Sequence, residues 1–227
     1  MRIRVIDFET TGMPPDAAVC EIGWTDVHRG SDISVSDPAS MLVNPRRPMS
    51  IEARAVHHIS DDDLKGAPPI TTGFRCLTEG FPSAFAAHHA AFELEFFRGG
   101  DTPWICTMKC ARRAWPDLTS YSNQFLRYAL DLPVDAEAAM PPHRAAPDTH
   151  VTAHLLVRLL AEHSFDTLIK WTKMPTHYPR VPMTKHKGKP WSEVDYGLLR
   201  WFQNADCDAD IKAAARAEMK RRDQMSF

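Results

Sequence analysis

The sequence predicts an α/β fold in which helices cover the faces of a mixed β-sheet. Three observations support this class: strand-like segments come first, later strand-like segments alternate with helix-like ones, and a stretch after Pro147 has apolar residues at helical spacing. The 227 residues suffice for one main core and a small appendage. With 44% hydrophobic and 25% charged residues, the composition is typical of a globular protein rather than a disordered or membrane-embedded one.

The first strand is expected at residues 2–6, where polar and apolar residues alternate and the run ends at Asp7. Such a strand places a carboxylate at its carboxyl end. Four more segments have strand character: 18–28, 33–43, 84–87 and 103–106. Because the turn-like sequence Arg29-Gly30-Ser31-Asp32 joins the second segment to the third, we expect an antiparallel meander at the start of the sheet.

Helical character recurs at 50–57, 69–79, 90–97 and 107–114. A longer helix is expected after Pro147, with apolar positions Val151, Leu155, Leu156, Leu159 and Leu160. Proline is tolerated in a first helical turn, and the carboxylate of Asp148 suits the positive end of the helix dipole. Asp148 is therefore predicted to open a helix that packs on the sheet.

The character of the chain changes after residue 163. Residues 164–180 are predicted to be a connector, and residues 181–227 a small basic and aromatic C-terminal module. The module has a basic stretch, Lys185–Lys189, and helix-like segments at 193–204 and 208–223. The nearby Trp191 and Trp201 would suit single-strand binding by stacking, although a small tryptophan core explains Trp201 at least as well.

Charge and cysteine content limit the possible functions. A formal net charge of -2 gives no global signal for nucleic acid, so binding to phosphate would need local basic patches or metal ions. Five cysteines without a CxxC pair argue against a disulfide framework and a zinc ribbon. No apolar stretch approaches the roughly 18 to 20 residues of a transmembrane helix, and the N-terminus does not resemble a signal peptide. We therefore expect a cytoplasmic protein with no membrane partner.

Carboxylates mark the candidate chemistry. Asp7 and Glu9 lie two residues apart on a strand, so they point to the same side and could share a hard divalent cation such as Mg²⁺. Taken alone, a strand followed by a polar turn explains this pair equally well. Two further segments add acids: Glu93 follows a buried strand at the start of a helix, and His143 precedes Asp148 by five positions.

Three segments together resemble the three motifs of the DEDDh 3′→5′ exonucleases, in the same order and at similar separations: 7–12 (DFETTG), 87–93 (AHHAAFE) and 143–148 (HRAAPD). The resemblance covers residues 1–163, which we predict to be an exonuclease domain, and it extends to 104–109 (WICTMK) and 121–123 (YSN). It implies a ribonuclease-H-like mixed five-stranded sheet flanked by helices. It also implies hydrolysis of nucleic-acid 3′ ends to nucleoside 5′-monophosphates.

The resemblance also implies metal-binding and catalytic roles for individual residues. Asp7, Glu9 and Asp148 would hold the first of two Mg²⁺ ions, for which Mn²⁺ is a possible substitute. Asp7 would bridge to the second ion, and Glu93 would support that ion through water. His143 would be the general base, a role that suits histidine because the unperturbed pKa of this side chain is about 6.5. Two such ions, about 3.5–4 Å apart, can stabilise the attacking and leaving oxygens of phosphoryl displacement.

Two positions depart from the family pattern. Glu93 stands where the family has aspartate, and its extra methylene group extends the carboxylate, which could weaken the second metal site. His89 stands where the family has asparagine, so the hydrogen bonds of that amide are lost here.

Seven residues are candidate substrate contacts: Thr10, Thr11, Met13, His57, His88, Lys109 and Arg112. In the family, the segment after the metal ligands meets the terminal 3′-OH, and a following hydrophobic residue, here Met13, wedges against the last base. Ordinary loop packing explains Met13 as well, and capping explains His57. Lys109 and Arg112 share a helix face that could contact phosphates or simply be solvated. His150, His154 and His163 are expected on a helix surface.

Three interpretations of function stay open. The leading one is a DNA exonuclease acting on single-stranded or duplex 3′ ends. The second keeps the chemistry and takes RNA as the substrate. The third is a nucleic-acid-binding accessory protein whose catalysis is impaired by Glu93. Unbalanced carboxylates repel one another without a cation, which counts against the third. No segment predicts a particular protein partner.

Overall fold

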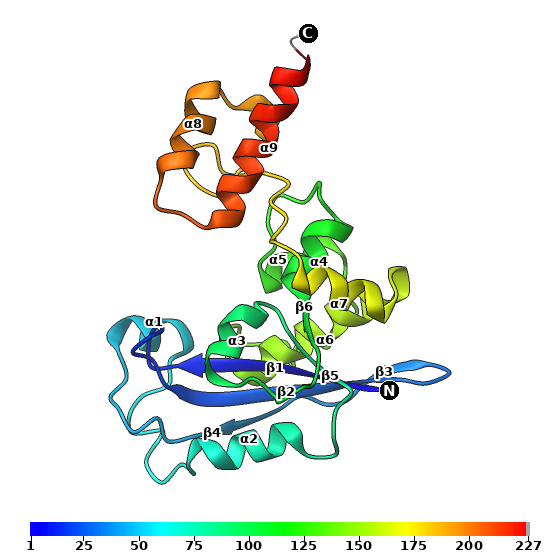
Figure 1. Cartoon of the computed structure of the whole chain (residues 1–227). Helices are drawn as coiled ribbons and strands as arrows, with labels where there is room; N and C mark the ends of the chain where they lie inside the picture. Colours follow the sequence, from blue (N-terminus) through cyan, green and yellow to red (C-terminus); the bar gives the residue numbers. More distant parts are fainter. Residues whose placement is uncertain (226–227) are drawn as a thin grey trace.

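The computed structural model describes residues 1–225 and contains a mixed six-stranded sheet with helices on both faces (Figure 1). The strands are β1 (Arg2–Thr10), β2 (Val19–Arg29), β3 (Ile33–Val35), β4 (Ala39–Leu42), β5 (Ala84–Ala87) and β6 (Trp104–Cys106). Their order is β3-β2-β1-β5-β6, and β4 also pairs with β2. β1 runs antiparallel to β2 and parallel to β5. The predicted α/β class is confirmed.

The sheet has six strands within residues 1–225, so the predicted count of five is wrong. The expected strand at 33–43 is divided into β3 and β4, which both pair with β2. Between them, Ser36 donates its N–H to the carbonyl of Asp26, and its hydroxyl accepts the Asp26 N–H, both at 2.9 Å. Pro38 then lacks an N–H to extend the ladder. These contacts break the segment into two strands.

Seven α-helices belong to the part of the described chain that carries the sheet: α1 (Ile51–His57), α2 (Ile70–Thr78), α3 (Ala90–Phe96), α4 (Thr107–Ala114), α5 (Asn123–Ala129), α6 (Ala145–Glu162) and α7 (Phe165–Lys173). We call residues 1–173 the α/β body. The helix expected after Pro147 begins at Ala145, with Pro147 and Asp148 in its first turn. Helix α7 lies within the predicted connector 164–180, yet it buries Leu168 in the core of the α/β body. The domain boundaries stay a prediction.

Two apolar clusters hold the helices on the sheet. On one face, Ile3 and Val5 of β1 pack with Leu155 and Leu159 of α6 and with residues of α4, α5 and α7. On the other face, Phe8 and neighbouring strand residues pack with α2 and α3. Because the sheet lies between these two clusters, it forms the central layer.

Gly23 of β2 sets the position of α6. It pairs with Asp7 in the β1–β2 register, and the first turn of α6 passes directly over it. A Cβ added at Gly23 would lie 2.7 Å from the Cβ of Ala145 and closer still to the Ala145 carbonyl. A second contact, the 2.9 Å hydrogen bond between the hydroxyls of Thr25 and Thr149, fixes the same turn. Glycine therefore lets the helix approach the sheet at this point.

Residues 181–225 form the C-terminal module, which has its own apolar cluster around Leu199, Phe202 and Ile211. Its helices are η1 (Trp191–Glu193), α8 (Tyr196–Asn204) and α9 (Ala209–Met225). Figure 1 shows the module standing apart from the sheet, on the side of α4 and α5. Trp191 is buried in the cluster, whereas Trp201 is 49% exposed. The predicted module extends to residue 227, and its last two positions lie outside the described residues.

The helices among residues 1–225 are all too short or too polar to span a lipid bilayer.

Replacing Gly23 with alanine is expected to destabilise the protein, because the new methyl group meets backbone that cannot rotate away. Overpacking of this kind costs about 1–3 kcal/mol. Each kcal/mol lowers the Tm by roughly 2–4 °C in a protein of this size. Thermal unfolding measures the effect. Gly30→Ala is the matched control, since its Cβ would meet no atom nearer than 4.0 Å. Equal melting temperatures for the two variants would contradict this account of Gly23.

Candidate active site

Three carboxylates meet where β1 faces the first turn of α6. Asp7 and Glu9 project from the same side of β1, and Asp148 reaches them from α6. One oxygen from each lies within 4.8 Å of the others, close enough to share a cation. The sequence prediction that these acids converge is consistent with this geometry. Because α6 approaches the sheet closely at Gly23, it brings Asp148 to the two carboxylates of β1.

The electrostatics of this group favour a bound cation. Burial and the neighbouring acids Glu9 and Asp148 raise the pKa of Asp7 well above its ordinary value. Burial, then Asp148 and Glu21, raise the pKa of Glu9 to about 8, although Arg144 opposes this. Burial also raises the pKa of Asp148. Since like charges in a poorly solvated site repel one another, a divalent cation would stabilise the ionised forms.

Glu93 lies beside this group but outside it. Its side chain projects from α3 and is 3% exposed. Its Oε2 is buried without a hydrogen-bond partner. Burial, with a smaller contribution from Glu9, raises the pKa of Glu93 to about 8. A buried carboxylate oxygen without a partner is costly, so this atom is suited to a ligand or an ordered water.

A cavity of about 600 Å³ brings these acids and His143 together. Its lining also includes Met13, His88, His89, Phe92 and Asn123. His143 is exposed, has a positive φ of 59°, and donates its backbone N–H to Oδ2 of Asp148 at 2.9 Å. All five predicted catalytic residues therefore line one cavity.

Glu21 and Arg144 hold the segment that carries His143, and sequence reasoning missed both. Arg144 donates from Nε and Nη2 to the two carboxylate oxygens of Glu21, each at 2.9 Å. The same carboxylate accepts the Ala145 N–H at 3.1 Å and the Ser40 hydroxyl at 3.0 Å. Although burial opposes it, these hydrogen bonds lower the pKa of Glu21. The available signal was a lone acid inside an apolar strand sequence, Val19-Cys20-Glu21-Ile22.

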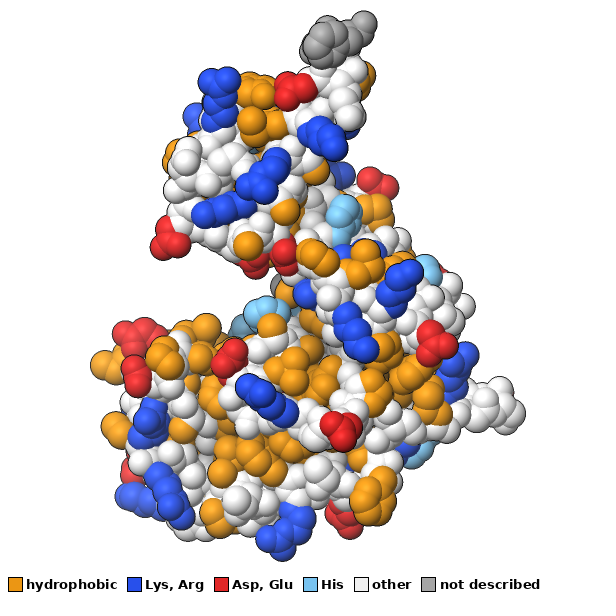
Figure 2. All heavy atoms as spheres, viewed as in Figure 1, with side chains coloured by type: hydrophobic (Ala, Val, Ile, Leu, Met, Phe, Trp, Pro, Cys, Tyr) orange, Lys and Arg blue, Asp and Glu red, His pale blue; other side chains and the backbone are white. Residues whose placement is uncertain are grey.

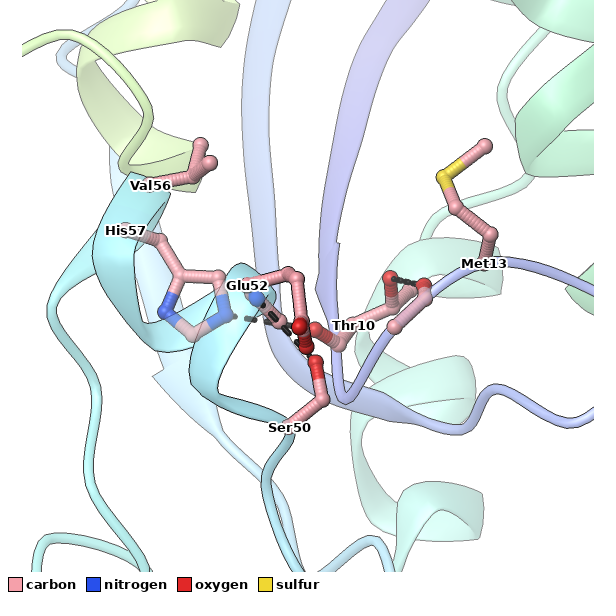
Figure 3. Close-up of a pocket in the computed structure, with 8 residues that line it drawn as sticks. Thr10, Met13, Ser50, Glu52, Val56 and His57 are labelled. Carbon is pink, nitrogen blue, oxygen red and sulfur yellow. Dashed lines mark hydrogen bonds between the residues drawn. The ribbon is translucent and has the colours of Figure 1, made fainter.

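A second cavity, of about 500 Å³, shares Met13 with the first (Figure 3). Thr10, Met13 and His57 line it, together with Gly12, Ser50, Glu52, Ala53 and Val56. Met13 lines both cavities and is 75% exposed, so it is free to contact a ligand in either. Figure 3 shows Met13 and His57 on opposite sides of Thr10.

Several predicted substrate residues already have partners inside the protein. His57 is buried, donates from Nε2 to the Thr10 carbonyl at 3.2 Å and accepts the Ile59 N–H at Nδ1. Burial lowers its pKa. The hydroxyl of Thr11 accepts the Ala18 N–H at 3.0 Å, and Thr11 lines neither cavity. The hydrogen bond from His57 to the Thr10 carbonyl therefore holds the backbone of Thr10 in place.

Three further candidates lie toward the C-terminal module. His88 donates from Nε2 to the Tyr121 carbonyl at 2.8 Å, and burial lowers its pKa to about 4. Lys109 donates to the carbonyls of Thr172 and Met174, at 3.3 and 2.8 Å, which tethers the end of α7. Arg112 stacks between the rings of Tyr121 and Tyr178 and does not line the cavity that holds the acids.

One expectation about the remaining histidines is wrong. His150 was expected on a helix surface, but it is only 7% exposed and packs edge-on against His154. This burial lowers the pKa of His150. The helical periodicity does not reveal which side chains other parts of the chain bury.

Known exonucleases are similar to this chain in sequence. Residues 5–156 match the exonuclease (RNase_T) family. Exodeoxyribonuclease 10 of Escherichia coli K12 is 33% identical over 211 residues, which cover 90% of this chain and 92% of that protein. A PolC-type DNA polymerase III of Bacillus cereus is 28% identical over 169 residues, 70% of this chain and 11% of its own length.

A solved structure is similar to this chain in fold and in sequence. Exonuclease X in complex with 5′ overhanging duplex DNA superposes with a TM-score of 0.66 at 32% identity, covering 75% of this chain and 99% of that chain. The predicted ribonuclease-H-like fold is thereby confirmed. The chain belongs to the exonuclease (RNase_T) family and is an exonuclease of the DEDDh type.

Proposed function

We propose that the chain is a magnesium-dependent 3′→5′ exodeoxyribonuclease that releases nucleoside 5′-monophosphates from single-stranded or duplex DNA ends. One observation carries the proposal: the three converging carboxylates, the unpartnered oxygen of Glu93 and the imidazole of His143 line one cavity. The choice of DNA is supported by the names of the relatives, an exodeoxyribonuclease and an exonuclease in complex with duplex DNA.

The donor set fits Mg²⁺, which prefers oxygen ligands and keeps several waters. Asp7, Glu9 and Asp148 would hold one ion, with Asp7 shared with a second. Glu93 would support the second ion through water, a role that its longer side chain and unpartnered oxygen allow. Mn²⁺ would substitute. When bound, two such ions supply charge stabilisation for the attacking and leaving oxygens of the phosphodiester.

His143 would act as the general base that takes the proton of the attacking water. Its backbone hydrogen bond to Asp148 fixes it beside the acids, and the Arg144–Glu21 pair holds the adjoining backbone. The second cavity would receive the terminal nucleotide, with the Thr10 backbone near the 3′-OH and Met13 against the last base. Its volume lies within the usual range for ligand sites.

Activity on labelled ends tests the proposal. With Mg²⁺ or Mn²⁺, the protein should release a 3′ label from DNA as mononucleotide before a 5′ label. Asp7→Ala should abolish release, and His143→Ala should lower kcat by about 10²–10⁴-fold, the usual contribution of a general base. His28→Ala is the control, because His28 is exposed at the far end of β2.

Other outcomes would select the alternatives. Faster release from RNA than from DNA of the same sequence would indicate an exoribonuclease. Binding of DNA without release of any nucleotide, with either metal, would indicate an accessory binding protein.

The raised pKa of Glu9 predicts an unusual pH dependence of stability. An unfolded glutamate titrates near 4.3, whereas burial raises the pKa of Glu9 to about 8. The stability that the neutral group contributes is therefore full below the unfolded pKa and is lost as pH rises through about 8. In EDTA, the Tm of wild type should fall between pH 6 and pH 9. The Tm of Glu9→Gln should fall less over the same pH range, so at pH 9 it should lie above the Tm of wild type.

Adding Mn²⁺ at pH 9 should raise the Tm of wild type above that of Glu9→Gln, because only wild type gains the stabilisation of a fully ligated ion. Glu95→Gln serves as the control, since Glu95 is exposed on α3. Scanning calorimetry gives all the values. If Glu9→Gln were less stable than wild type at pH 9 in EDTA, the electrostatic account of the acids would be wrong.

A further inference from the structure

We propose a phosphodiester-binding subsite at the junction between the α/β body and the C-terminal module, formed by Arg112, Arg180 and Lys187. This inference rests on the proposed function, because it concerns how the strand whose 3′ end enters the active site is held upstream. Figure 2 shows a notch between the two parts of the molecule. A cavity of about 330 Å³ at the junction is lined by residues of both.

The charge of this cavity is one-sided. Its lining contains the three cationic side chains and no carboxylate. Of the ion pairs formed within residues 1–225, none involves Arg112, Arg180 or Lys187. The remaining polar lining includes the hydroxyl side chains of Ser120 and Ser122. Cations with neutral hydroxyl donors are the groups that contact phosphate oxygens in nucleic-acid complexes.

Arg112 is held in advance for such a contact. Its guanidinium lies between the rings of Tyr121 and Tyr178, 4.8 and 4.7 Å from their centroids. Its Nε is buried without a hydrogen-bond partner. Two aromatic faces therefore fix the plane of the fork, and its terminal nitrogens, rather than the buried Nε, are the groups that would meet a phosphate. A planar fork fixed in this way binds phosphate with little loss of side-chain entropy.

Arg180 belongs to the segment that leads into the C-terminal module, and Lys187 belongs to the module itself. Arg180 donates from Nη1 to the Gly188 carbonyl at 3.1 Å, and its Nε is buried without a partner. Backbone hydrogen bonds from Gly188 to Val181, 2.8 Å, and from Val181 to Lys189, 2.9 Å, fix the turn that carries Lys187. The basic stretch noticed in the sequence is thus presented toward the junction through Lys187.

The junction cavity adjoins the cavity that holds the acids. His88 and Ser122 line both the cavity that holds the acids and the cavity at the junction. Burial lowers the pKa of His88 to about 4, so this shared wall is neutral at working pH. A single strand with its 3′ end at Asp7 could therefore continue past Ser122 to the three cations. The C-terminal module would act as an upstream clamp on the substrate.

Binding of labelled DNA tests this subsite without requiring catalysis. Anisotropy titrations in EDTA should show that Lys187→Glu raises the Kd for a 12-nucleotide single strand about fivefold or more. The slope of log Kd against log salt should fall by roughly one. Lys185→Glu is the matched control, because Lys185 is exposed on the same turn but does not line the cavity. Arg112→Lys should also weaken binding, since the charge stays but the stacked fork is lost.

A nucleoside 5′-monophosphate has no upstream phosphodiester for the junction to hold, so all variants should bind it like wild type. Equal effects of Lys187→Glu and Lys185→Glu, or an equal loss on the monophosphate, would overturn the subsite. Hydrolysis with Mg²⁺ is measured in parallel. A wild type that binds in a Lys187-dependent way but releases no nucleotide would overturn the proposed function alone. A wild type that cleaves while Lys187→Glu matches its control would overturn the subsite alone.

Discussion

The close approach of α6 to β2 at Gly23 is the constraint on which the active site depends. Gly23 pairs with Asp7 across the first two strands, and the backbone of Ala145 occupies the space where a side chain would lie. Because Asp148 follows three residues later in the same turn, its carboxylate comes to the edge where Asp7 and Glu9 project. A strand, a glycine and a helix start therefore build a three-acid group from segments far apart in sequence.

This arrangement concentrates negative charge, and the protein balances part of it. Glu21 lies opposite Glu9 in the strand register and would add a further carboxylate. Arg144 and the backbone of Ala145 hydrogen-bond Glu21, so it stays charged while it holds the segment that carries His143. Asp148 accepts the backbone N–H of His143, but within residues 1–225 no arginine or lysine forms an ion pair with Asp7, Glu9 or Asp148. Their raised pKa values describe a site that a divalent cation would complete.

The sequence predicted what depends on local periodicity. Alternation along the first strand placed Asp7 and Glu9 on one side, and the apolar spacing after Pro147 placed Asp148 in a first helical turn. Contacts between distant segments could not be predicted in this way. The split of 33–43 depends on hydrogen bonds between Ser36 and Asp26. The position of Arg112 depends on a tyrosine 66 residues later in the chain, Tyr178. Local patterns carry no information about such partners.

The most direct test of this account is the number of divalent ions that the acids bind. Calorimetric titration of Mn²⁺ at pH 8, with a nucleoside monophosphate present, should give two saturable ions per chain for wild type. Glu93→Gln should keep one, because Asp7, Glu9 and Asp148 remain to hold the first. Absence of saturable binding by wild type, or two ions with unchanged affinity in Glu93→Gln, would contradict the account of this site.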